Sequence, residues 1–480
     1  MDSAIRRTKI VCTIGPASNT EYKIAELIAA GMNVARLNFS HGTHSEHASV
    51  IAAIRRVSRR LSKPISILQD LQGPKIRIGT LVGGEAVLLR DQAPFTITTR
   101  EVEGTADEVS TTYDGLPGDV HRGDRLLLDD GRMELAVEGV VGEDVHTRVV
   151  HGGMLKEHKG INLPGVMVNI PSLTEKDRED LEFGVAQGVD YVAMSFVRRP
   201  EDVATVKRAL VECDPAAAKL PVIAKLEKPA ALDNLDAILQ VADGVMVARG
   251  DLGVELSPQE VPTAQKRIIQ AANRERKIVI TATQMLESMM TSPIPTRAET
   301  SDVANAIYDG SDAVMLSGET ASGEFPIEAV RMMASIIKEA EAHIEEWGRW
   351  HGATESTSDD SVALARAARE LAHDRDVTAV AIFTLTGRNA RIISKARPHV
   401  PILAFTPDAK TYQRLPLLWG VTPYLIPQAD TVEAMLAHVE AGMLYDSPVR
   451  PGQQVIVIAG LPPSKLVPAN FILLHTVGRS

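Results

Sequence analysis

Eight short apolar segments, most of them followed by a helix-like stretch, constrain the fold of this chain more than any other feature. Apolar runs of strand length that alternate with helical patterns favour parallel strands joined by helical crossovers. Eight such units are typical of a TIM (β/α)8 barrel, so we expect a fold of the α/β class built on a barrel. The eight segments are Thr8–Ile14, Asn33–Asn38, Ile65–Leu71, Asp190–Phe196, Pro221–Glu227, Gly244–Ala248, Lys277–Ala282 and Asp312–Leu316.

One connection in this series is about a hundred residues long, far longer than the loops of compact domains. It separates the third and fourth segments and holds short runs rich in Val, Thr and Leu, divided by Gly and Asp turns. The pattern predicts an inserted all-β domain over 72–169, a β-barrel that acts as a lid over the active site. The runs are Leu88–Arg90, Phe95–Thr99, Arg125–Leu128, Glu134–Val141 and Val145–Val150.

The barrel is then expected over 1–71 and 170–345, with a second α/β domain over 346–480. Its last helix, predicted over Pro326–His343, has an apolar stripe that favours core packing over a partner surface. The polar stretch Gly348–Asp360 predicts a linker. Five later runs predict a doubly wound C-terminal domain: Val377–Leu385, Pro401–Phe405, Thr422–Ile426, Val455–Gly460 and Phe471–His475.

Composition narrows the class of protein. The 480 residues need more than one hydrophobic core, and the net charge of −11 argues against a general nucleic-acid binder. Cys12 and Cys213 are isolated, which favours a reducing cytoplasm over a disulfide framework. No apolar run is long enough to span a membrane, and the run after Arg6 and Arg7 is too short for a targeting signal.

The most informative charged residues end the fifth segment and follow the sixth: Lys225, Glu227, Arg249 and Asp251. Lys225 and Glu227 are two apart, so they point to the same side of their strand. Strand-end carboxylates are oxygen ligands for Mg²⁺ or Mn²⁺, and a lysine beside them holds a phosphoryl group. We therefore expect a metal-plus-anion site suited to phosphoryl transfer. The alternative, a structural ion pair between Lys225 and Glu227, does not account for Asp251.

Other segments also end in polar residues. Arg36, Asn38 and Ser40 are spaced by two at the end of the second segment and just beyond it, so they point to one side, where they suit an anion beside a cation. A capped strand end is the alternative. Thr283 follows the seventh segment, where its hydroxyl contacts substrate, relays a proton or caps the next helix.

The third segment ends at Asp70 and leads through Gly73 and Pro74 into the inserted domain. Lys75 and Arg77 lie two apart at this hinge and face the same side. They either contact a ligand or form a charged hinge in solvent.

At this point the sequence resembles the pyruvate kinase family. The motifs RLNFSHG, GPKIR, KLE, MVARGDLGVE, TATQMLESM, PTRAE, SDVANA and MLSGETASGEFP occur in the family's order, from about Thr8 to the C-terminal HTVG. The resemblance implies phosphoryl transfer from phosphoenolpyruvate to ADP, giving pyruvate and ATP. It also implies a cytoplasmic, allosterically regulated homotetramer without nucleic-acid or membrane partners.

The resemblance assigns roles to the strand-end residues. Glu227 and Asp251 bind the divalent metal, Lys225 stabilises the transferring phosphoryl group, and Arg36 holds the phosphate. Gly250, together with Asp251, lies against the substrate carboxylate. Two further assignments lie nearby: Thr283 close to the methylene that is protonated, and Arg77 with Lys159 on the nucleotide phosphates.

One departure from the family pattern concerns the monovalent cation. Many members read DTKGPEIR where this chain has DLQGPKIR, and those with Glu need K⁺. The family's ion site matches Asn38, Ser40, Asp70 and the backbone of Leu71. The ammonium of Lys75 in place of the acid supplies the positive charge of K⁺, so we expect activity independent of K⁺.

The segment TLTGR at Thr384–Arg388 resembles the family's effector phosphate loop. The implied effector-binding residues are Thr384, Thr386, Gly387, Arg388 and Asn389. The family's fructose bisphosphate binders often have lysine where this chain has Leu385, and PPSKLVPAN replaces the late Gly-rich loop, so another phosphate effector or none is an alternative. The alternative without a binding role is an unoccupied strand–helix turn.

Two other functions compete with a pyruvate kinase. The first is another Mg²⁺-dependent barrel acting on phosphoenolpyruvate or pyruvate, such as a mutase or aldolase relative. The ADP-facing lid with Arg77 and Lys159 argues against it. The joint presence of Lys225, Glu227, Asp251 and Thr283 argues against a catalytically silent metabolite-binding regulator.

Overall fold

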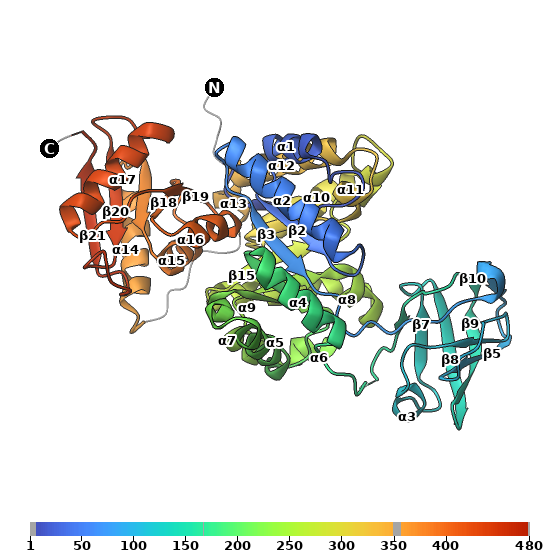
Figure 1. Cartoon of the computed structure of the whole chain (residues 1–480). Coiled ribbons are helices and arrows are strands. Elements are labelled where there is room, and N and C mark those ends of the chain that lie inside the picture. The colour runs from blue at the N-terminus through green and yellow to red at the C-terminus, as the bar shows by residue number, and fades with distance from the viewer. Residues whose placement is uncertain (1–5, 167, 349–356, 479–480) are drawn as a thin grey trace.

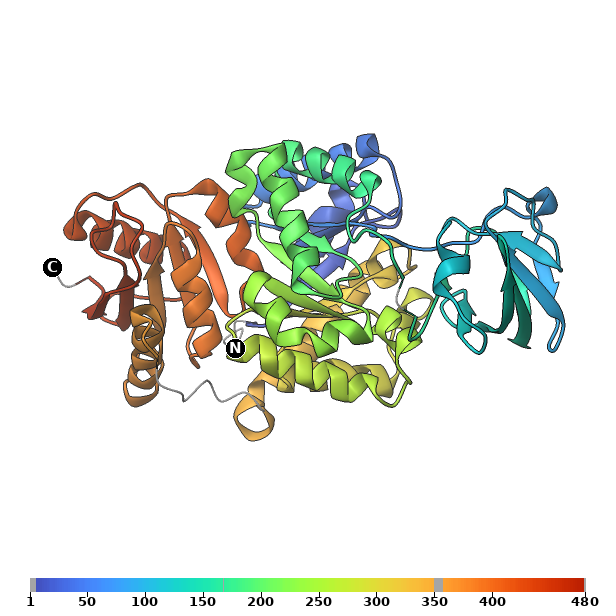
Figure 2. The ribbon, with the colours of Figure 1, turned by 90° about the horizontal axis from the view of Figure 1, so that it is seen from below.

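The computed structural model describes residues 6–166, 168–348 and 357–478. The chain forms a central barrel with the inserted sheets on one side and the C-terminal domain on the other, as both views show (Figures 1 and 2). Within the described ranges, none of the helices has the length and apolar character needed to cross a membrane.

The barrel is closed and all its strands run parallel, in the order β1-β16-β15-β14-β13-β12-β3-β2. This confirms the predicted fold class, and each strand lies within its predicted apolar segment. The strands are β1 (Lys9–Thr13), β2 (Val34–Asn38), β3 (Ser66–Asp70), β12 (Tyr191–Met194), β13 (Val222–Leu226), β14 (Gly244–Ala248), β15 (Ile278–Ala282) and β16 (Ala313–Leu316).

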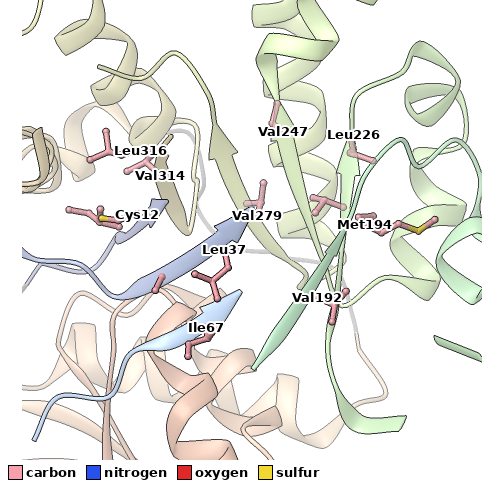
Figure 3. Close-up of a cluster of buried hydrophobic side chains, with 14 of the residues drawn as sticks. Cys12, Leu37, Ile67, Val192, Met194, Leu226, Val247, Val279, Val314 and Leu316 are labelled. Atoms are coloured by element: carbon pink, nitrogen blue, oxygen red, sulfur yellow. The ribbon is translucent and has the colours of Figure 1, made fainter. Parts of the chain in front are cut away.

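Alternate strand residues divide between two packed faces of the barrel wall. Cys12, Leu37 and Ile67 belong to a buried cluster that includes the surrounding helices (Figure 3), while Val11 and Leu68 belong to the inner cluster. The residues of the predicted stripe in α12, Val330, Met333, Ile336, Ile337 and Ala340, are buried, which confirms core packing. The helices of this region are α1 (Glu21–Ala30), α2 (His44–Arg60), α4 (Glu175–Gln187), α5 (Pro200–Cys213), α6 (Pro229–Asp233), α7 (Leu235–Val241), α8 (Arg249–Glu255), α9 (Val261–Arg274), α10 (Arg297–Tyr308), α11 (Gly318–Ala321), α12 (Pro326–Ala342) and α13 (Ile344–Trp347), with 3₁₀ turns η2 (Pro215–Lys219) and η3 (Glu287–Met290).

The insertion between β3 and α4 forms a six-stranded sheet, β11-β7-β8-β9-β5-β6, and a separate pair, β10-β4. This differs from the expected β-barrel, because the edge strands β11 and β6 are only two and three residues long and do not pair with each other. The elements are η1 (Val82–Gly84), β4 (Val87–Leu89), β5 (Pro94–Thr98), β6 (Glu108–Ser110), α3 (Leu116–Asp119), β7 (Arg125–Leu128), β8 (Met133–Val141), β9 (Asp144–His151), β10 (Gly153–Leu155) and β11 (Ile161–Asn162).

The C-terminal domain has a five-stranded sheet in the order β19-β18-β17-β20-β21, parallel except for the antiparallel edge strand β21. All five predicted strands are present. Of the predicted linker Gly348–Asp360, residues 349–356 lie outside the described residues, and α14 begins at Asp360. The elements are α14 (Asp360–Asp374), β17 (Ala379–Phe383), α15 (Arg388–Ala396), β18 (Ile402–Thr406), α16 (Ala409–Arg414), η4 (Leu415–Leu417), β19 (Val421–Leu425), α17 (Val432–Asp446), β20 (Gln454–Ala459) and β21 (Phe471–Thr476).

The C-terminal domain packs against the amino-terminal ends of the barrel strands. The Lys9 ammonium donates to the Val421 carbonyl at 2.7 Å. The Ser66 hydroxyl donates to the Gln413 carbonyl at 2.7 Å, and the Tyr191 hydroxyl donates to the Arg414 carbonyl at 2.8 Å. Apolar side chains of η4 join the inner cluster of the barrel. This domain therefore closes the floor of the barrel and leaves the carboxyl ends of its strands for the candidate site.

Candidate active site

A compact group of charged side chains lies where β2, β3 and β13 end. The Lys225 ammonium is 3.2 Å from Asp70 Oδ1 and 3.0 Å from Glu227 Oε1. Arg36 Nε donates to Asp70 Oδ2 at 2.6 Å. The barrel register explains this meeting, because the carboxyl ends of parallel strands lie at the same end of the sheet. The structure thus brings together three residues with predicted roles, Arg36, Lys225 and Glu227, and adds Asp70 as their link.

The group holds a positive charge in a buried place. Burial opposes the charge on Lys225, but the carboxylates of Asp70 and Glu227 outweigh it and raise its pKa above the ordinary value. Asp70 shows the reciprocal effect: burial favours its neutral form, yet Lys225 and Arg36 outweigh burial and lower its pKa. Lys225 is therefore a fixed cation whose side chain is only 12% exposed.

Glu227 and Asp251 are the two carboxylates with metal-binding potential in this group. Burial, and then the nearby negative charge of Asp251, raise the pKa of Glu227. Two acids that disfavour each other's charge fit a divalent cation, which would relieve the repulsion. Among the described residues, no group of three or more His, Cys, Asp or Glu side chains forms a closed metal site. Proteins often hold Mg²⁺ or Mn²⁺ by one or two carboxylates together with water and substrate oxygens.

Thr283 and Gly250 face each other across the ends of β15 and β14. The Gly250 N–H donates to Thr283 Oγ1 at 2.8 Å, and the Thr283 hydroxyl donates to the Ala282 carbonyl at 2.7 Å. Neither bond caps the helical turn that follows Thr283, η3, which begins at Glu287. Gly250 and Asp251 lie in the first turn of α8. Thr283 therefore stands at the mouth of the barrel with its hydroxyl fixed in direction.

The turn that carries Thr283 is strained and braced. Thr283 and Gln284 both have positive φ, 66° and 54°, which is uncommon for residues other than glycine. Arg249 holds this turn by donating to the Thr283 carbonyl at 2.7 Å and to the Gln284 carbonyl at 3.1 Å. An ion pair with Asp302 at 2.6 Å orients the guanidinium, which is itself buried. Arg249 is thus a positioning residue, a role that the sequence did not reveal.

Sequence reasoning also missed two hydroxyl residues at strand ends. The Lys225 ammonium donates to Ser195 Oγ at 2.7 Å, and Ser195 donates to the Leu71 carbonyl at 2.7 Å. Arg36 Nη1 donates to Thr13 Oγ1 at 3.0 Å. The strand-end argument that singled out Thr283 applies equally to Ser195 after β12 and to Thr13 in β1.

The hinge residues lie at the base of the insertion, apart from the central group. Arg77 Nη1 donates to the His158 carbonyl at 3.0 Å, and its backbone bridges to Gly160. Lys159 pairs with Asp129 at 2.7 Å. The two residues predicted to meet nucleotide phosphates therefore lie on adjoining backbone at the neck of the insertion.

Lys75 is not bonded to the residues of the predicted cation site. Within the described residues its ammonium has no hydrogen bond or ion pair, and its stem packs near Gly160. It acts electrostatically on His41, whose pKa is lowered by burial and then by Arg77 and Lys75. Asn38 Oδ1 accepts from the Ser40 N–H at 3.2 Å. Lys75 is thus a free cation close to the second strand's loop.

The predicted effector loop follows β17. The Gly387 N–H donates to Thr384 Oγ1 at 3.0 Å, and Gly387 has φ of 78°, a conformation that favours glycine. Arg388 turns away to pair with Asp359 at 2.6 Å. A cavity of about 190 Å³ adjoins the loop and is lined by Thr384, Thr386, Arg388, Asn389 and Lys465, among others.

Comparison with known families agrees with this architecture. The family model of the pyruvate kinase barrel domain matches residues 5–330, and that of the pyruvate kinase alpha/beta domain matches residues 362–475. The chain belongs to the pyruvate kinase family. It is therefore an enzyme of the phosphotransferase class.

Individual pyruvate kinases are similar over nearly the whole chain. One from Staphylococcus epidermidis is 44% identical over 477 residues, which are 99% of this chain and 81% of that protein. One from Geobacillus stearothermophilus is 45% identical over 476 residues, 98% and 80% of the two chains. A crystal structure of a pyruvate kinase from Cryptosporidium parvum has a TM-score of 0.90 at 35% identity and covers 98% of this chain and 96% of its own. The similarity to this solved structure thus extends over the inserted sheets and the C-terminal domain.

Proposed function

We propose that this chain transfers the phosphoryl group of phosphoenolpyruvate to ADP, giving pyruvate and ATP. The bond from phosphorus to the enol oxygen breaks, a bond to a β-phosphate oxygen of ADP forms, and the enolate takes up one proton at its methylene carbon. The observation that carries the proposal is the Lys225 ammonium, held 3.2 and 3.0 Å from two carboxylates at the open end of the barrel beside Arg36.

Lys225 and Arg36 bind and stabilise the phosphoryl group in this proposal. A transferring phosphoryl group carries negative charge on its equatorial oxygens, so fixed cations stabilise the transition state. Lys225 stays protonated because Asp70 and Glu227 outweigh the burial that would lower its pKa. Arg36 is held in direction by its bonds to Asp70 and Thr13. Both cations are therefore in place before substrate arrives, which avoids a reorganisation cost.

Gly250, Asp251 and Thr283 orient the organic part of the substrate. The substrate carboxylate lies against Gly250 and Asp251 at the start of α8. Thr283 lies near the methylene carbon, and its hydroxyl orients the proton that converts enolate to ketone. The bond from the Gly250 N–H to Thr283 Oγ1 at 2.8 Å ties these two binding elements together.

Glu227 and Asp251 would hold Mg²⁺ or Mn²⁺. When bound, the metal would supply positive charge that offsets the negative charge of the reacting substrate. The Phe196 N–H donates to Glu227 Oε2 at 2.6 Å and so fixes the carboxylate that faces this position.

Residues 72–169 serve as a lid over the barrel formed by 1–71 and 170–345. Arg77 and Lys159, at the neck of the lid, contact the phosphates of ADP. Closure brings the two substrates together and excludes water, so that the phosphoryl group is not lost to hydrolysis.

Lys75 makes the reaction independent of K⁺. It is free of hydrogen bonds and ion pairs among the described residues and is placed at the hinge, so its charge is available at the site matching Asn38, Ser40 and Asp70. We expect less than a twofold rate change when tetramethylammonium replaces K⁺. The Lys75→Glu variant should then need K⁺ for full activity. A strong rise in the rate of the unaltered chain with K⁺ would contradict this assignment.

Residues 346–480 form a regulatory domain. Thr384, Thr386, Gly387, Arg388 and Asn389 bind a phosphate-bearing effector, supported by the strand–helix turn and the adjoining cavity of about 190 Å³. We further propose a cytoplasmic homotetramer, consistent with the family. Size-exclusion chromatography with light scattering tests the oligomeric state.

A pyruvate-coupled assay tests the central proposal. We expect pyruvate from phosphoenolpyruvate only when ADP and Mg²⁺ are both present, with one ATP formed per pyruvate. Pyruvate formed equally well without ADP would indicate a different barrel reaction. Absence of turnover with normal binding of phosphoenolpyruvate would indicate a silent regulator.

A further inference from the structure

The lid is joined to the barrel by two chain crossings that one carboxylate holds together. The outgoing crossing passes Gly73, whose N–H donates to Asp177 Oδ1 at 3.0 Å. The returning crossing passes Thr174, whose N–H and hydroxyl donate to Asp177 Oδ2 at 3.0 and 2.6 Å. Asp177 is buried in the first turn of α4. Two crossings held at one point still leave the lid free to rotate about that point, so its orientation needs a second contact.

A second buried carboxylate, Glu255, supplies that contact. Asn162, in the edge strand β11 of the lid, donates from Nδ2 to Glu255 Oε1 at 3.1 Å. Asn162 is 7% exposed and Glu255 is 8% exposed. In the part of the chain that the structure describes, this is the one hydrogen bond between a strand of the lid and the barrel. A buried bond to a charged acceptor is stronger than a neutral one, so it favours one orientation of the lid.

Glu255 is itself held from the barrel side. The ammonium of Lys228, which precedes α6, pairs with the same Oε1 atom that Asn162 contacts. It also lies 5.8 Å from the centre of the Phe196 ring. A carboxylate buried without a cation is costly, so Lys228 compensates the charge of Glu255 and fixes the direction of its carboxylate.

The neck of the lid carries the two cations assigned to the phosphates of ADP. Arg77 bridges to Gly160 across the neck, and Lys159 comes directly before Gly160. Gly160 is followed at once by β11, in which Asn162 lies. Paired backbone moves as one unit, so the contact between Asn162 and Glu255 places both cations relative to the barrel.

The barrel side of this contact is the helix that faces the organic substrate. Figure 1 shows α8 on the side of the barrel toward the inserted sheets. Gly250 and Asp251 lie in the first turn of α8, and Glu255 is its last residue. Asp251 and Glu255 are four residues apart, so they lie on one side of the helix and about 6 Å apart along its axis. One short helix thus carries both the substrate-facing residues and the anchor of the lid.

We propose that Glu255 is a positioning residue: through Asn162 it anchors the neck of the lid and so places Arg77 and Lys159 relative to α8. Glu255 touches neither substrate in this assignment. The kinetic consequence rests on the proposed reaction, because it requires ADP to meet the two cations of the neck. The structural consequence, a lid held in one orientation, does not depend on turnover.

The orientation of the lid can be measured directly with two spin labels. Cys213, the last residue of α5, is an exposed thiol on the barrel, while Cys12 is buried. Val141→Cys adds a second thiol at the end of β8 in the lid, where Val141 is 68% exposed. Double electron–electron resonance between nitroxides at these positions gives the distribution of distances between lid and barrel. Every variant carries the same label pair, so any distance between subunits is common to all.

Asn162→Ala removes the bond from the lid side and leaves the pair of Glu255 with Lys228 intact. We expect the distance distribution to become about 1.5 times as wide, because other orientations of the lid are then populated. Asn169→Ala, at an exposed asparagine of the returning segment, is the matched control and should leave the distribution unchanged. If circular dichroism shows that Asn162→Ala is not folded, Glu255→Gln takes its place. It keeps an acceptor for Asn162 but not the charge, so it should widen the distribution less.

The kinetic effect should be confined to the nucleotide. Apparent affinity falls with the fraction of chains in the competent orientation, so Asn162→Ala should raise KM for ADP about tenfold. KM for phosphoenolpyruvate should stay within about twofold, since the groups that bind it lie on the barrel. Binding of Mn²⁺, followed by electron paramagnetic resonance, should not change, because Glu227 and Asp251 are untouched.

Two results would overturn the proposal. One is a distance distribution in Asn162→Ala as narrow as that of the unaltered chain. The other is an equal rise of KM for both substrates, which would show a disturbed α8 rather than a released lid. A widened distribution in a chain that makes no pyruvate or ATP would support the anchor and contradict the proposed reaction, so the two failures are distinguishable.

Discussion

Two buried lysines, Lys225 at the carboxyl end of the barrel and Lys395 at its floor, have pKa values shifted in opposite directions. Around Lys225 the carboxylates of Asp70 and Glu227 outweigh burial and raise its pKa. Around Lys395, burial lowers the pKa to about 8, although the ammonium pairs with Asp312 and donates to Asn273 Oδ1 at 2.8 Å. The same side chain is thus a fixed cation at one end of the barrel and a titratable group at the other.

The difference comes from how carboxylates are shared. Lys225 contacts two carboxylates, whereas Asp312 is shared by two cations, Lys395 and Arg397, the latter at 2.8 Å. The second cation repels the proton on Lys395, and Arg391 adds to this effect. At the catalytic end Lys225 stays charged and can bind substrate. At the floor the ion pairs join α15 of the C-terminal domain to the barrel.

The largest effect should come from removing the fixed cation. Lys225→Met is expected to lower kcat more than about a thousandfold, because a positive charge at the transferring group is worth several kcal/mol in the transition state. Binding of Mn²⁺, followed by electron paramagnetic resonance, should be retained through Glu227 and Asp251. Lys395→Met is the matched buried-lysine control and should keep its kcat within about threefold. A kcat near the original in Lys225→Met would contradict the assigned role.

Loss of the carboxylate shared at the barrel floor should lower the free energy of unfolding. Asp312→Asn removes the charge that faces both Lys395 and Arg397, and we expect about 3 kcal/mol of destabilisation in urea unfolding. Asp236→Asn is the control, because Asp236 pairs with Arg274 at the surface with 79% of its side chain exposed. That substitution should cost less than about 0.5 kcal/mol. Equal losses in the two variants would show that Asp312 is no more than a surface partner.

The strands of both ends could be predicted from sequence, because a buried parallel strand gives a continuous apolar run. Every barrel strand lies within its predicted segment. The strands that escaped prediction are β6, β10 and β11, which have two or three residues each and give no period to detect. The motif RGDLG also begins α8 although its two glycines disfavour a helix.

The catalytic end was more predictable than the floor for a physical reason. Lys225, Glu227 and Arg36 lie in the last residues of apolar runs or directly after them, so their positions alone single them out. The floor joins Asp312 to Lys395, 83 positions later, and Lys395 to Asn273, 122 positions earlier. No local sequence pattern predicts such a contact, because each residue alone resembles an ordinary residue at the end of a strand or helix.

The pH dependence of stability should distinguish the two lysines. Lys395 has a pKa of about 8 in the folded chain, below its ordinary value of 10.5. Between these values the unfolded chain binds one more proton than the folded chain, so its contribution to the unfolding free energy rises with pH. From pH 8 to 9.5 we expect a gain on the order of 1 kcal/mol in the unaltered chain relative to Lys395→Met. Lys225 is charged in both states over this range and adds nothing. A difference that is flat or falls with pH would contradict the lowered pKa.

The smallest effect should come from the ring that supports the floor's second cation. The Arg397 guanidinium lies 4.3 Å from the centre of the Trp419 ring, and Arg7 lies 5.7 Å from it. Trp419→Phe keeps an aromatic face but weakens its attraction for the cations, so we expect a loss of about 0.5–1 kcal/mol in urea unfolding at pH 7. Trp347→Phe, at a residue that is 64% exposed, should cause no measurable change. The Trp419 loss should also shrink in the Asp312→Asn background, because Arg397 is then no longer held over the ring. Additive losses in the double variant would show that the ring and the carboxylate act on Arg397 independently.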